Sequence, residues 1–399
     1  MSSIKLKHSG GNGVSIAPPD TNPASDKTVK LPAANGTLLT TESSPSFRNV
    51  AYNGACQIAQ RGASFASVTA TGTFPVDRFV FHIASCGTWT VSQDTDVPTG
   101  EGFVNSIKCD VTTADTNVGS GGYCRVDQRL EGQDLQRFRK GTANAKDFAL
   151  SFWVKSSKTG THIVELQDAD NTRNISKSYT VSSANTWEKK ELIISKDTTG
   201  AFGNDNAKSL TIAWWLAAGS NYTSGTLATS WVTPTNANRV VGQVSCVDNV
   251  ANNFYLTGVQ LETGDACSEF EFRSYGDELL RCQRYYQKFS NYSVYAGGSR
   301  ASTSKRVTIP LICSMRATPT WFGYLRLYAP GTDDYETSSN TAGVVGGVTP
   351  TIECTAGENA FTFFYSGSIS GLSDTANSQY GIMLDEVSSE TRHYLEAEL

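Results

Sequence analysis

The feature that most constrains the fold is a repeated alternation of apolar and polar residues in short runs. Between residues 47 and 275 these runs include Phe79 to Ile83, Phe103 to Val111, Phe148 to Val154 and Leu210 to Leu216. Period-2 alternation is typical of a strand with one buried and one solvated face. Several such strands joined by Gly, Asn and Asp turns predict an all-β chain, with a central β-sandwich of jelly-roll type.

Length and composition agree with this prediction. The chain has 399 residues, and hydrophobic residues make up 39%, charged residues 18% and aromatic residues 10%. Such a length corresponds to two or three domains at roughly 150 residues each. The low charge and ample aromatics argue against disorder and allow sizeable cores. The 35 glycines favour many short strands joined by tight turns.

The first 45 residues form a module that differs from the rest. Pairs of apolar residues alternate with turn sequences such as Gly10 to Gly13 and Asn35-Gly36, which favours a small meander of short strands. A hairpin of this size is marginally stable alone, so the module needs partners, and copies of itself are the simple source. The apolar residues concerned include Leu6, Val14, Ile16, Val29 and Leu31.

A short helix is expected after the central sandwich. Ser274 is a suitable N-cap, and Asp277 and Glu278 in the first turn complement the helix dipole. The apolar face would carry Leu279, Cys282 and Tyr286.

Strand-like sequence then resumes up to Leu399 and predicts a second, smaller β-sandwich. Its expected strands lie at 307–312, 321–328, 361–365 and 380–384. We therefore predict three domains: an N-terminal module at 1–45, a central sandwich at 46–275, and a helix with a C-terminal sandwich at 276–399.

Charge and hydropathy exclude several partners. The net charge is −5, and no basic cluster suggests nucleic acid or anionic lipid. The apolar run Leu210 to Ala218 is shorter than the roughly 20 residues of a membrane-spanning helix. The first twenty residues lack the apolar stretch of a signal peptide. We expect a soluble protein made in a cytoplasm, without membrane insertion.

No motif of a metal centre, a cofactor site or an enzyme is recognisable. The nine cysteines include no CxxC pair, and the four histidines are scattered. We expect the cysteines to be reduced and buried, acting as small apolar residues. The glycines complete neither a P-loop nor a GxGxxG pattern, and no G-x-S-x-G is present. The sequence thus favours a protein that is not an enzyme and has no cofactor.

Acidic pairs leave two alternatives open. We interpret them first as solvated turn residues. A pair held about 5 to 10 Å apart could instead serve a glycosidase. Asp168 and Asp170, or Asp94 and Asp96, could also bind Ca²⁺ through their hard oxygen ligands. The pairs are Asp94 with Asp96, Asp168 with Asp170, Glu262 with Asp265, and Asp333 with Asp334.

Aromatic residues crowd the C-terminal part, where core packing is the favoured interpretation of Trp321 and Phe322. Tyrosines in Gly-, Ser- and Asp-rich sequence are better placed on loops, where binding residues concentrate. A sugar ring needs an aromatic face beside polar groups. The predicted carbohydrate-binding residues are Tyr292, Tyr295, Tyr335, Asp333 and Asp334.

Four stretches together resemble virion fibre and tail-fibre proteins of tailed bacteriophages, of the marine and cyanobacterial type. Leu150 to Lys155 with Asn185 to Glu188 is similar to a jelly-roll module of carbohydrate-binding type. The most specific stretch joins Gly258-Val-Gln-Leu-Glu262, Phe270 to Tyr275 and Glu278 to Tyr286. The remaining stretches are Leu6 to Pro19 with Thr28 to Leu38, and Asn53 to Gly62 with Asp77-Arg78; the ending Glu396 to Leu399 is also similar.

This resemblance implies a homotrimeric, non-enzymatic protein at the virion surface. The N-terminal module, through its apolar residues named above, would attach to tail or capsid proteins. The C-terminal domain would reach a host surface polysaccharide or outer-membrane receptor. The alternatives are a head fibre, decoration protein or tail adaptor without receptor binding, and, less favoured, a capsular depolymerase. The family supplies no catalytic residue to this sequence.

Overall fold

The computed structural model describes residues 4–7, 13–16, 47–289, 294–301, 304–322, 325–328, 351–353, 360–366, 379–384 and 393–399. The chain divides into two compact units, Met1–Ser44 and Pro45–Leu399. In the first unit, β1 (Ile4–Lys7) pairs antiparallel with β2 (Gly13–Ile16), and Leu6 lies opposite Val14. The predicted strands around Leu6 and Ile16 are confirmed. Val29 and Leu31 lie outside the described residues.

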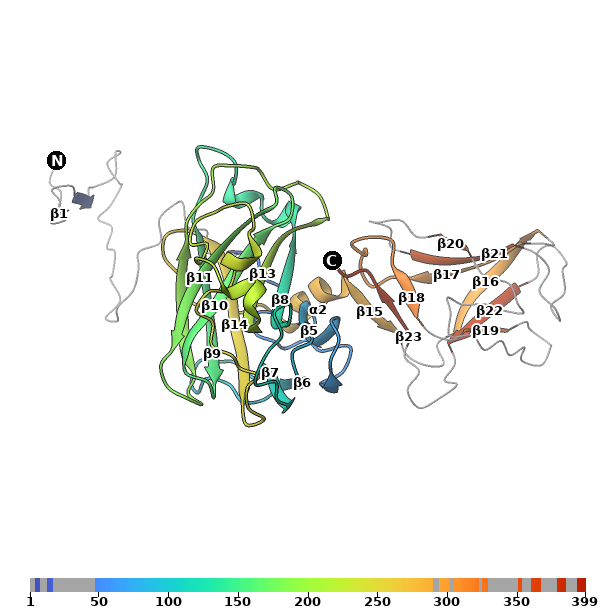
Figure 1. Ribbon diagram of the computed structural model, residues 1–399. Coiled ribbons are helices and arrows are strands. Elements are labelled where there is room, and N and C mark those ends of the chain that lie inside the picture. Colours follow the sequence, from blue (N-terminus) through green and yellow to red (C-terminus); the bar gives the residue numbers. More distant parts are fainter. Residues whose placement is uncertain are drawn as a thin grey trace. The chain divides into compact units, whose positions relative to one another are not determined.

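The centre of the second unit is a β-sandwich of two six-stranded antiparallel sheets (Figure 1). In sheet I the strand order is β11 (Arg173–Val181), β10 (Gly160–Asp168), β13 (Lys208–Ala218), β8 (Tyr123–Glu131), β5 (Phe79–Ala84) and β4 (Thr73–Val76). In sheet II it is β12 (Glu188–Ile194), β9 (Phe148–Ser156), β14 (Asn253–Thr263), β7 (Ser106–Thr113), β6 (Thr88–Asp94) and β3 (Ser64–Val68). The prediction of a central sandwich is confirmed.

The chain crosses between the sheets repeatedly, so the inward faces of both sheets build one core. Large rings meet there: Phe152 packs against Trp214 with ring centroids 5.8 Å apart, and Phe79 against Trp214 at 6.2 Å. The alternating residues predicted for β9 and β13 are buried as expected, among them Phe148, Leu150, Leu210 and Ile212.

Two local predictions differ from the structure. Phe103 lies in the loop before β7, where its ring packs against Phe270 and Phe272. Strand β13 is buried on both faces, because Trp215 and Ala213 on its outer face contact Val240 from the following segment. That segment contains α1 (Ser220–Thr223) and the 3-10 turn η3 (Asn236–Asn238); two further 3-10 turns, η1 (Gly132–Asp134) and η2 (Gln136–Phe138), follow β8.

The predicted helix is α2 (Tyr275–Gln283), which begins at the expected N-cap. The backbone N–H of Asp277 donates to Ser274 Oγ at 3.2 Å. Glu278 is buried and accepts a 2.6 Å hydrogen bond from the N–H of Asn53, so it joins the helix to the sandwich rather than only facing the helix dipole. Tyr286 falls outside the helix, since it begins the next strand and pairs with Glu396.

Two more antiparallel sheets follow α2. The first contains β15 (Tyr286–Phe289), β23 (His393–Glu396) and β18 (Thr320–Phe322). The second contains β19 (Leu325–Tyr328), β22 (Gln379–Leu384), β16 (Val294–Ala301), β17 (Ser304–Pro310), β21 (Ala360–Ser366) and β20 (Thr351–Glu353). The predicted strands of this part are therefore present, while their packing as a second sandwich and the three domain boundaries stay predictions.

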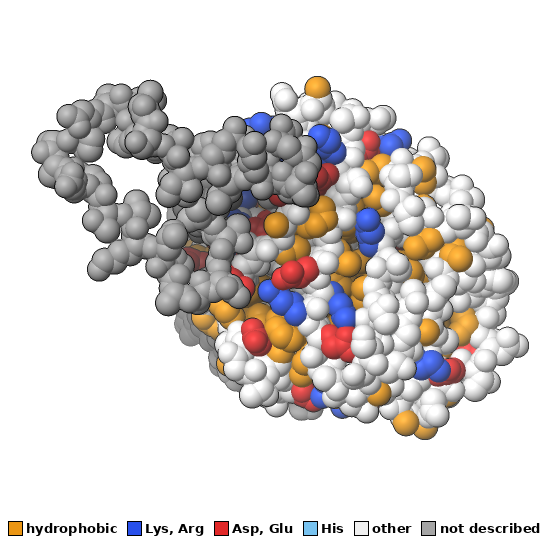
Figure 2. Space-filling view, turned by 90° about the vertical axis from the view of Figure 1, so that its left-hand side faces the viewer, with side chains coloured by type: hydrophobic (Ala, Val, Ile, Leu, Met, Phe, Trp, Pro, Cys, Tyr) orange, Lys and Arg blue, Asp and Glu red, His pale blue; other side chains and the backbone are white. Residues whose placement is uncertain are grey.

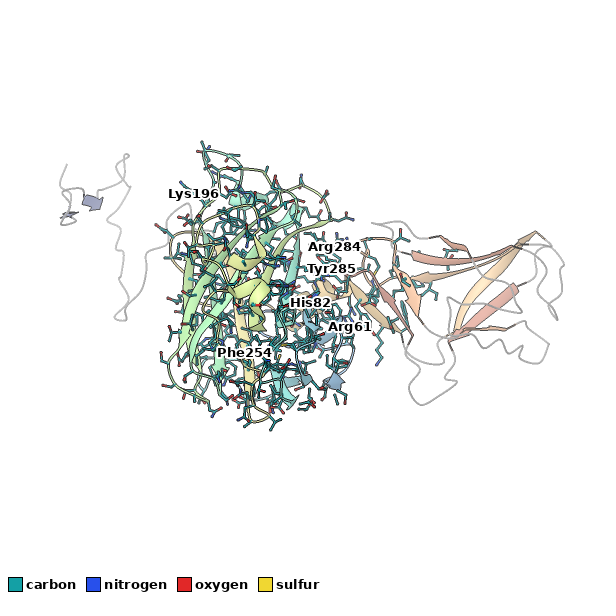
Figure 3. The ribbon with its side chains drawn as sticks, viewed as in Figure 1. Arg61, His82, Lys196, Phe254, Arg284 and Tyr285 are labelled. Carbon is teal, nitrogen blue, oxygen red and sulfur yellow. The ribbon has the colours of Figure 1, made fainter. Side chains whose placement is uncertain are left out.

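Glu398 and Leu399 connect this C-terminal part to the sandwich through ion pairs and apolar packing. Glu398 pairs with Arg78 and, at 3.0 Å, with Arg61. The Arg78 guanidinium also lies 3.3 Å from the ring centroid of Tyr285, and Figure 3 labels Arg61 and Tyr285 in this region. Leu399 packs against the sandwich core. We call Arg61, Arg78, Tyr285 and Glu398 the C-terminal clasp.

Candidate functional site

Most of the predicted carbohydrate-binding residues lie outside the described part of the chain. This holds for Tyr292, Asp333, Asp334 and Tyr335. Tyr295 falls in β16, at the register position opposite Ile382. The predicted site in the C-terminal part stays a prediction.

The structure gives Asp168 and Asp170 structural contacts. Asp168 is buried and pairs with Lys140 Nζ at 2.6 Å, and it accepts a hydrogen bond from the N–H of Asn171 at 3.1 Å. Asp170 accepts from the N–H of Gly203 at 2.8 Å. Among the described residues, no three His, Cys, Asp or Glu side chains gather in a metal-binding group. The ammonium group of Lys140 lies against the Asp168 carboxylate, at the position that a bound Ca²⁺ ion would need.

The two carboxylates of the acidic pair Glu262 and Asp265 lie in different environments. Glu262 is buried and accepts hydrogen bonds from Ser268, whose Oγ lies 2.7 Å from Oε1. Asp265 is exposed. One carboxylate therefore fixes a loop while the other faces solvent.

The outer face of sheet II brings together residues from five strands. Register places Lys155 of β9 beside Tyr255 of β14, Tyr255 beside Lys108 of β7, and Lys108 beside Ser92 of β6. Trp187 directly precedes β12 and continues its register opposite Lys155, because Glu188 pairs with Val154. We call Trp187, Lys155, Tyr255, Lys108 and Ser92 the sheet II row.

The rings and ammonium groups of the row are in contact. The rings of Trp187 and Tyr255 meet edge to face at 6.0 Å, and Lys155 Nζ lies 4.8 Å from the Tyr255 centroid. Tyr255 is only 7% exposed, whereas Trp187 is half-buried. Tyr255 therefore lies beneath the row, and Trp187 is the more exposed of the two rings.

Asp96 contacts both Trp187 and Lys155, the two residues at one end of the row. Its Oδ1 accepts a 2.9 Å hydrogen bond from Trp187 Nε1, and its Oδ2 pairs with Lys155. Burial acts to raise the pKa of Asp96, but hydrogen bonds from Lys155 and Trp187 outweigh it and leave the pKa lowered. A general acid needs a raised pKa. The arrangement therefore suits Asp96 for orienting Trp187 better than for proton transfer in a pair with Asp94.

The sequence indicates two residues of this site but not that they lie together. Lys155 and Trp187 fall in the stretches 150–155 and 185–188, which contribute only to the family resemblance. No sequence pattern points to Tyr255 or Lys108. Lys108 lies 47 residues before Lys155, and Tyr255 lies 68 residues after Trp187, so only the strand order brings these residues together.

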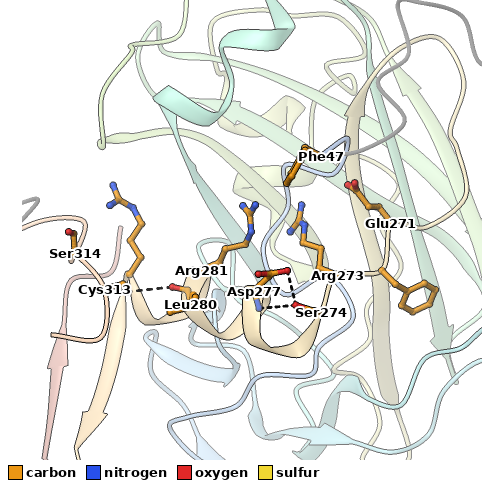
Figure 4. Close-up of a pocket in the computed structure, with 11 residues that line it drawn as sticks. Phe47, Glu271, Arg273, Ser274, Asp277, Leu280, Arg281, Cys313 and Ser314 are labelled. Atoms are coloured by element: carbon orange, nitrogen blue, oxygen red, sulfur yellow. Dashed lines mark hydrogen bonds between the residues drawn. The ribbon is translucent and has the colours of Figure 1, made fainter. Parts of the chain in front are cut away.

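A separate pocket of about 700 Å³ lies beside α2 (Figure 4). Apolar side chains with large exposed fractions line it: Phe47 at 66%, Phe272 at 50% and Leu280 at 46%. Tyr275 and Ile312 nearby are exposed as well. These five are the majority of the eight large apolar side chains that are exposed among the described residues. We call them the α2 patch.

Charge is mixed on the surface. In the view of Figure 2, Lys and Arg side chains alternate with Asp and Glu over the coloured part of the face. No helix in the described residues is long and apolar enough to cross a membrane.

Comparison with known proteins finds fold similarity without a family. No protein-family model matches the chain, and no curated protein matches its sequence. Among solved structures, the enzymatically active domain of bacteriophage CBA120 tailspike protein 4 is 16% identical over 54% of this chain and 21% of that chain, with a TM-score of 0.29.

Two other structures are similar over nearly their whole length. A structure described as a putative sugar-binding protein from Bacteroides thetaiotaomicron is 12% identical over 54% of this chain and 100% of its own, with a TM-score of 0.30. The family 11 carbohydrate-binding module of a Clostridium thermocellum cellulase is 12% identical over 50% of this chain and 97% of its own, with a TM-score of 0.24. The similarity is distant and assigns no ligand to this chain.

Proposed function

We propose that this chain is a non-enzymatic fibre protein at the surface of a tailed-phage virion, and that it binds a host surface glycan. The sheet II row carries the glycan part of the proposal. The half-buried ring of Trp187 lies beside Asp96 and Lys155, and this combination offers an apolar ring next to charged hydrogen-bonding groups. The phage part rests on the sequence resemblance alone.

Trp187→Ala tests the glycan part. Purified protein is titrated with lipopolysaccharide and capsular polysaccharide preparations, and the affinity for any preparation that binds is compared between variants. Removal of the ring should weaken binding at least about tenfold, the equivalent of about 1.4 kcal/mol. Trp187→Phe keeps a ring and should lose less. Binding that is equal in all three proteins would contradict a role for the row.

We also propose that the chain associates as a homotrimer, with the α2 patch in the interface. Contiguous exposed apolar patches mark interaction sites. The patch includes Phe47, the first described residue after a 46-residue segment that contains the small β1–β2 hairpin. A module of that size needs partner surface to be stable. A second copy of this chain would supply apolar surface to the α2 patch and strands of the same kind to the module.

A further inference from the structure

A second polar site lies on the opposite side of the sandwich, on the outer face of sheet I. Arg125, Asp127 and Arg129 are alternate residues of β8 and therefore share the outer face of the strand. Register sets Asp127 beside Ala213 of β13, and Ala213 beside Glu165 of β10. The next row sets Arg129 beside Thr211, and Thr211 beside Gln167.

The segment after β13 covers only part of this face. Arg239 reaches back to Glu165 with hydrogen bonds of 2.8 and 2.9 Å and lies 5.1 Å over the ring of Trp215. A hollow of about 290 Å³ lies beside this segment, lined by its Pro234 and Arg239 and by Thr211 of β13. Its lining includes Glu165, Gln167, Arg173, Lys208, Thr211 and Arg239, and we call it the Lys208 pocket.

Most charges in the Lys208 pocket are already paired. Glu165 accepts from Arg239 and also from Asn174 Nδ2 at 2.8 Å. Arg173 pairs with Asp197 at 2.7 Å. Lys208 is the exception, because it has no hydrogen-bond or ion-pair partner among the described residues. The pocket therefore presents one ammonium group, on the exposed side chain of Lys208, that makes no direct contact with a carboxylate among the described residues.

Neighbouring cations strengthen this positive field. Burial lowers the pKa of Lys208, and Arg129 and Arg125 lower it further. The same two arginines and Lys208 act with burial on His82, whose pKa falls to about 3. Two carboxylates act on these cations: Asp127 on Lys208 and Arg129, and Glu398 on Arg129. The carboxylates of the pocket lining, Glu165 and Asp168, are paired with Arg239 and Lys140. An anion at Lys208 would relieve the repulsion.

The floor of the pocket has neutral hydrogen-bonding groups. Gln167 Nε2 donates to Glu165 at 3.0 Å, while its amide oxygen accepts no hydrogen bond from a described residue. The Thr211 hydroxyl lies beside it in the next strand. The hollow also exceeds the size of a bare carboxylate. A ligand that fits carries an anionic group together with hydroxyls.

We propose that the Lys208 pocket binds a uronic acid residue of an acidic polysaccharide. Lys208 pairs with the sugar carboxylate, and Gln167 and Thr211 hydrogen-bond its hydroxyls. The site is on the other sheet from the sheet II row and is independent of the function proposed for that row.

Trigalacturonate and its methyl ester test the proposal, since the ester has the same hydroxyls without the charge. Titration calorimetry with the full chain should show binding of the acid and at least about tenfold weaker binding of the ester, as expected for a charged hydrogen bond. Lys208→Gln should weaken binding of the acid by a similar factor, and Lys208→Arg should retain it. Lys158→Gln, the same change at a lysine that precedes β10, pairs with Asp248 and does not line the pocket, is the control and should bind normally.

Several results would overturn the proposal. These are no binding of trigalacturonate, equal binding of acid and ester, or normal binding by Lys208→Gln. Inorganic sulfate that binds as tightly as trigalacturonate would reduce the pocket to an anion site without sugar recognition. Loss of binding in Trp187→Ala with normal binding in Lys208→Gln would place the acidic sugar at the sheet II row instead.

Discussion

The indole Nε1 of Trp187 donates a 2.9 Å hydrogen bond to Oδ1 of Asp96, 91 residues earlier in the chain. The bond ties the start of β12 to the loop after β6. Asp96 is anchored in turn by Lys155 from β9. Three separate segments of sheet II therefore fix the orientation of one half-exposed ring.

Asp96 substitutions separate orientation from charge. Asp96→Asn can still accept from Trp187 Nε1, so it should keep glycan affinity within about twofold. Asp96→Ala removes the acceptor and leaves the indole free to rotate, at a cost of about 1 kcal/mol in binding. Glycan titration checks both variants. Equal loss in Asn and Ala variants would mean that the charge at Asp96, and not the hydrogen bond, matters.

Leu280→Asp tests the α2 patch. Leu280 is 46% exposed, so the substitution should leave the fold intact while placing a charge in the proposed interface. Light scattering should give about three times 42.9 kDa for the wild-type chain and a lower mass for the variant. Val250→Asp, at another exposed apolar residue away from α2, is the control and should keep the wild-type mass. A wild-type monomer would contradict the trimer.

His82 makes stability depend on pH in a defined direction. Burial, Arg125 and Arg129 lower its pKa to about 3, and Arg129 Nη2 donates to His82 Nε2 at 2.8 Å, which needs the neutral ring. In the unfolded chain the imidazole has its ordinary pKa near 6.5. The unfolded state therefore binds an extra proton between about pH 6.5 and 3, and the folded state loses stability as pH falls through this range.

His82→Gln should remove this contribution. Gln still accepts from Arg129 but does not titrate. The wild-type chain should lose about 1 kcal/mol more unfolding free energy than the variant when the pH falls from 7 to 4.5. This magnitude allows for partial solvent access to the ring. Urea unfolding at the two pH values measures the difference. The same difference at both pH values would show that His82 is not the titrating group.

Glu398 and Glu396 provide a matched pair for the C-terminal clasp. Glu398→Gln removes the charge partner of Arg78, whose side chain is 2% exposed, and should cost about 3 kcal/mol. Glu396 has a 29% exposed side chain and pairs with Arg61, so Glu396→Gln should cost less than about 1 kcal/mol. The urea midpoint reports both. Equal effects would mean that burial of Arg78 does not depend on Glu398.

Strands were predictable wherever alternation was strong. In β9 the inward residues Phe148, Leu150 and Phe152 follow the period of the pleat, so local sequence carries the signal. Helix α2 was equally local, since Ser274 and Asp277 mark its start. The alternation in β13 predicts one solvated face, but Tyr222 and Val240 from the segment after the strand cover Trp215, and this cover leaves no trace in the local pattern.

The sites divide in the same way. Sequence alone determined a mostly β chain, the positions of its most strongly alternating strands, the helix cap and the low charge, because these depend on residue type and on spacing within a few positions. Only the tertiary structure decided that Trp187 meets Tyr255 and Asp96, that Lys208 has no partner within the described part of the chain, and that Arg78 pairs with Glu398. Strand order and register decide which distant residues become neighbours, and a sequence pattern with period two fixes the face of a strand but not its partner.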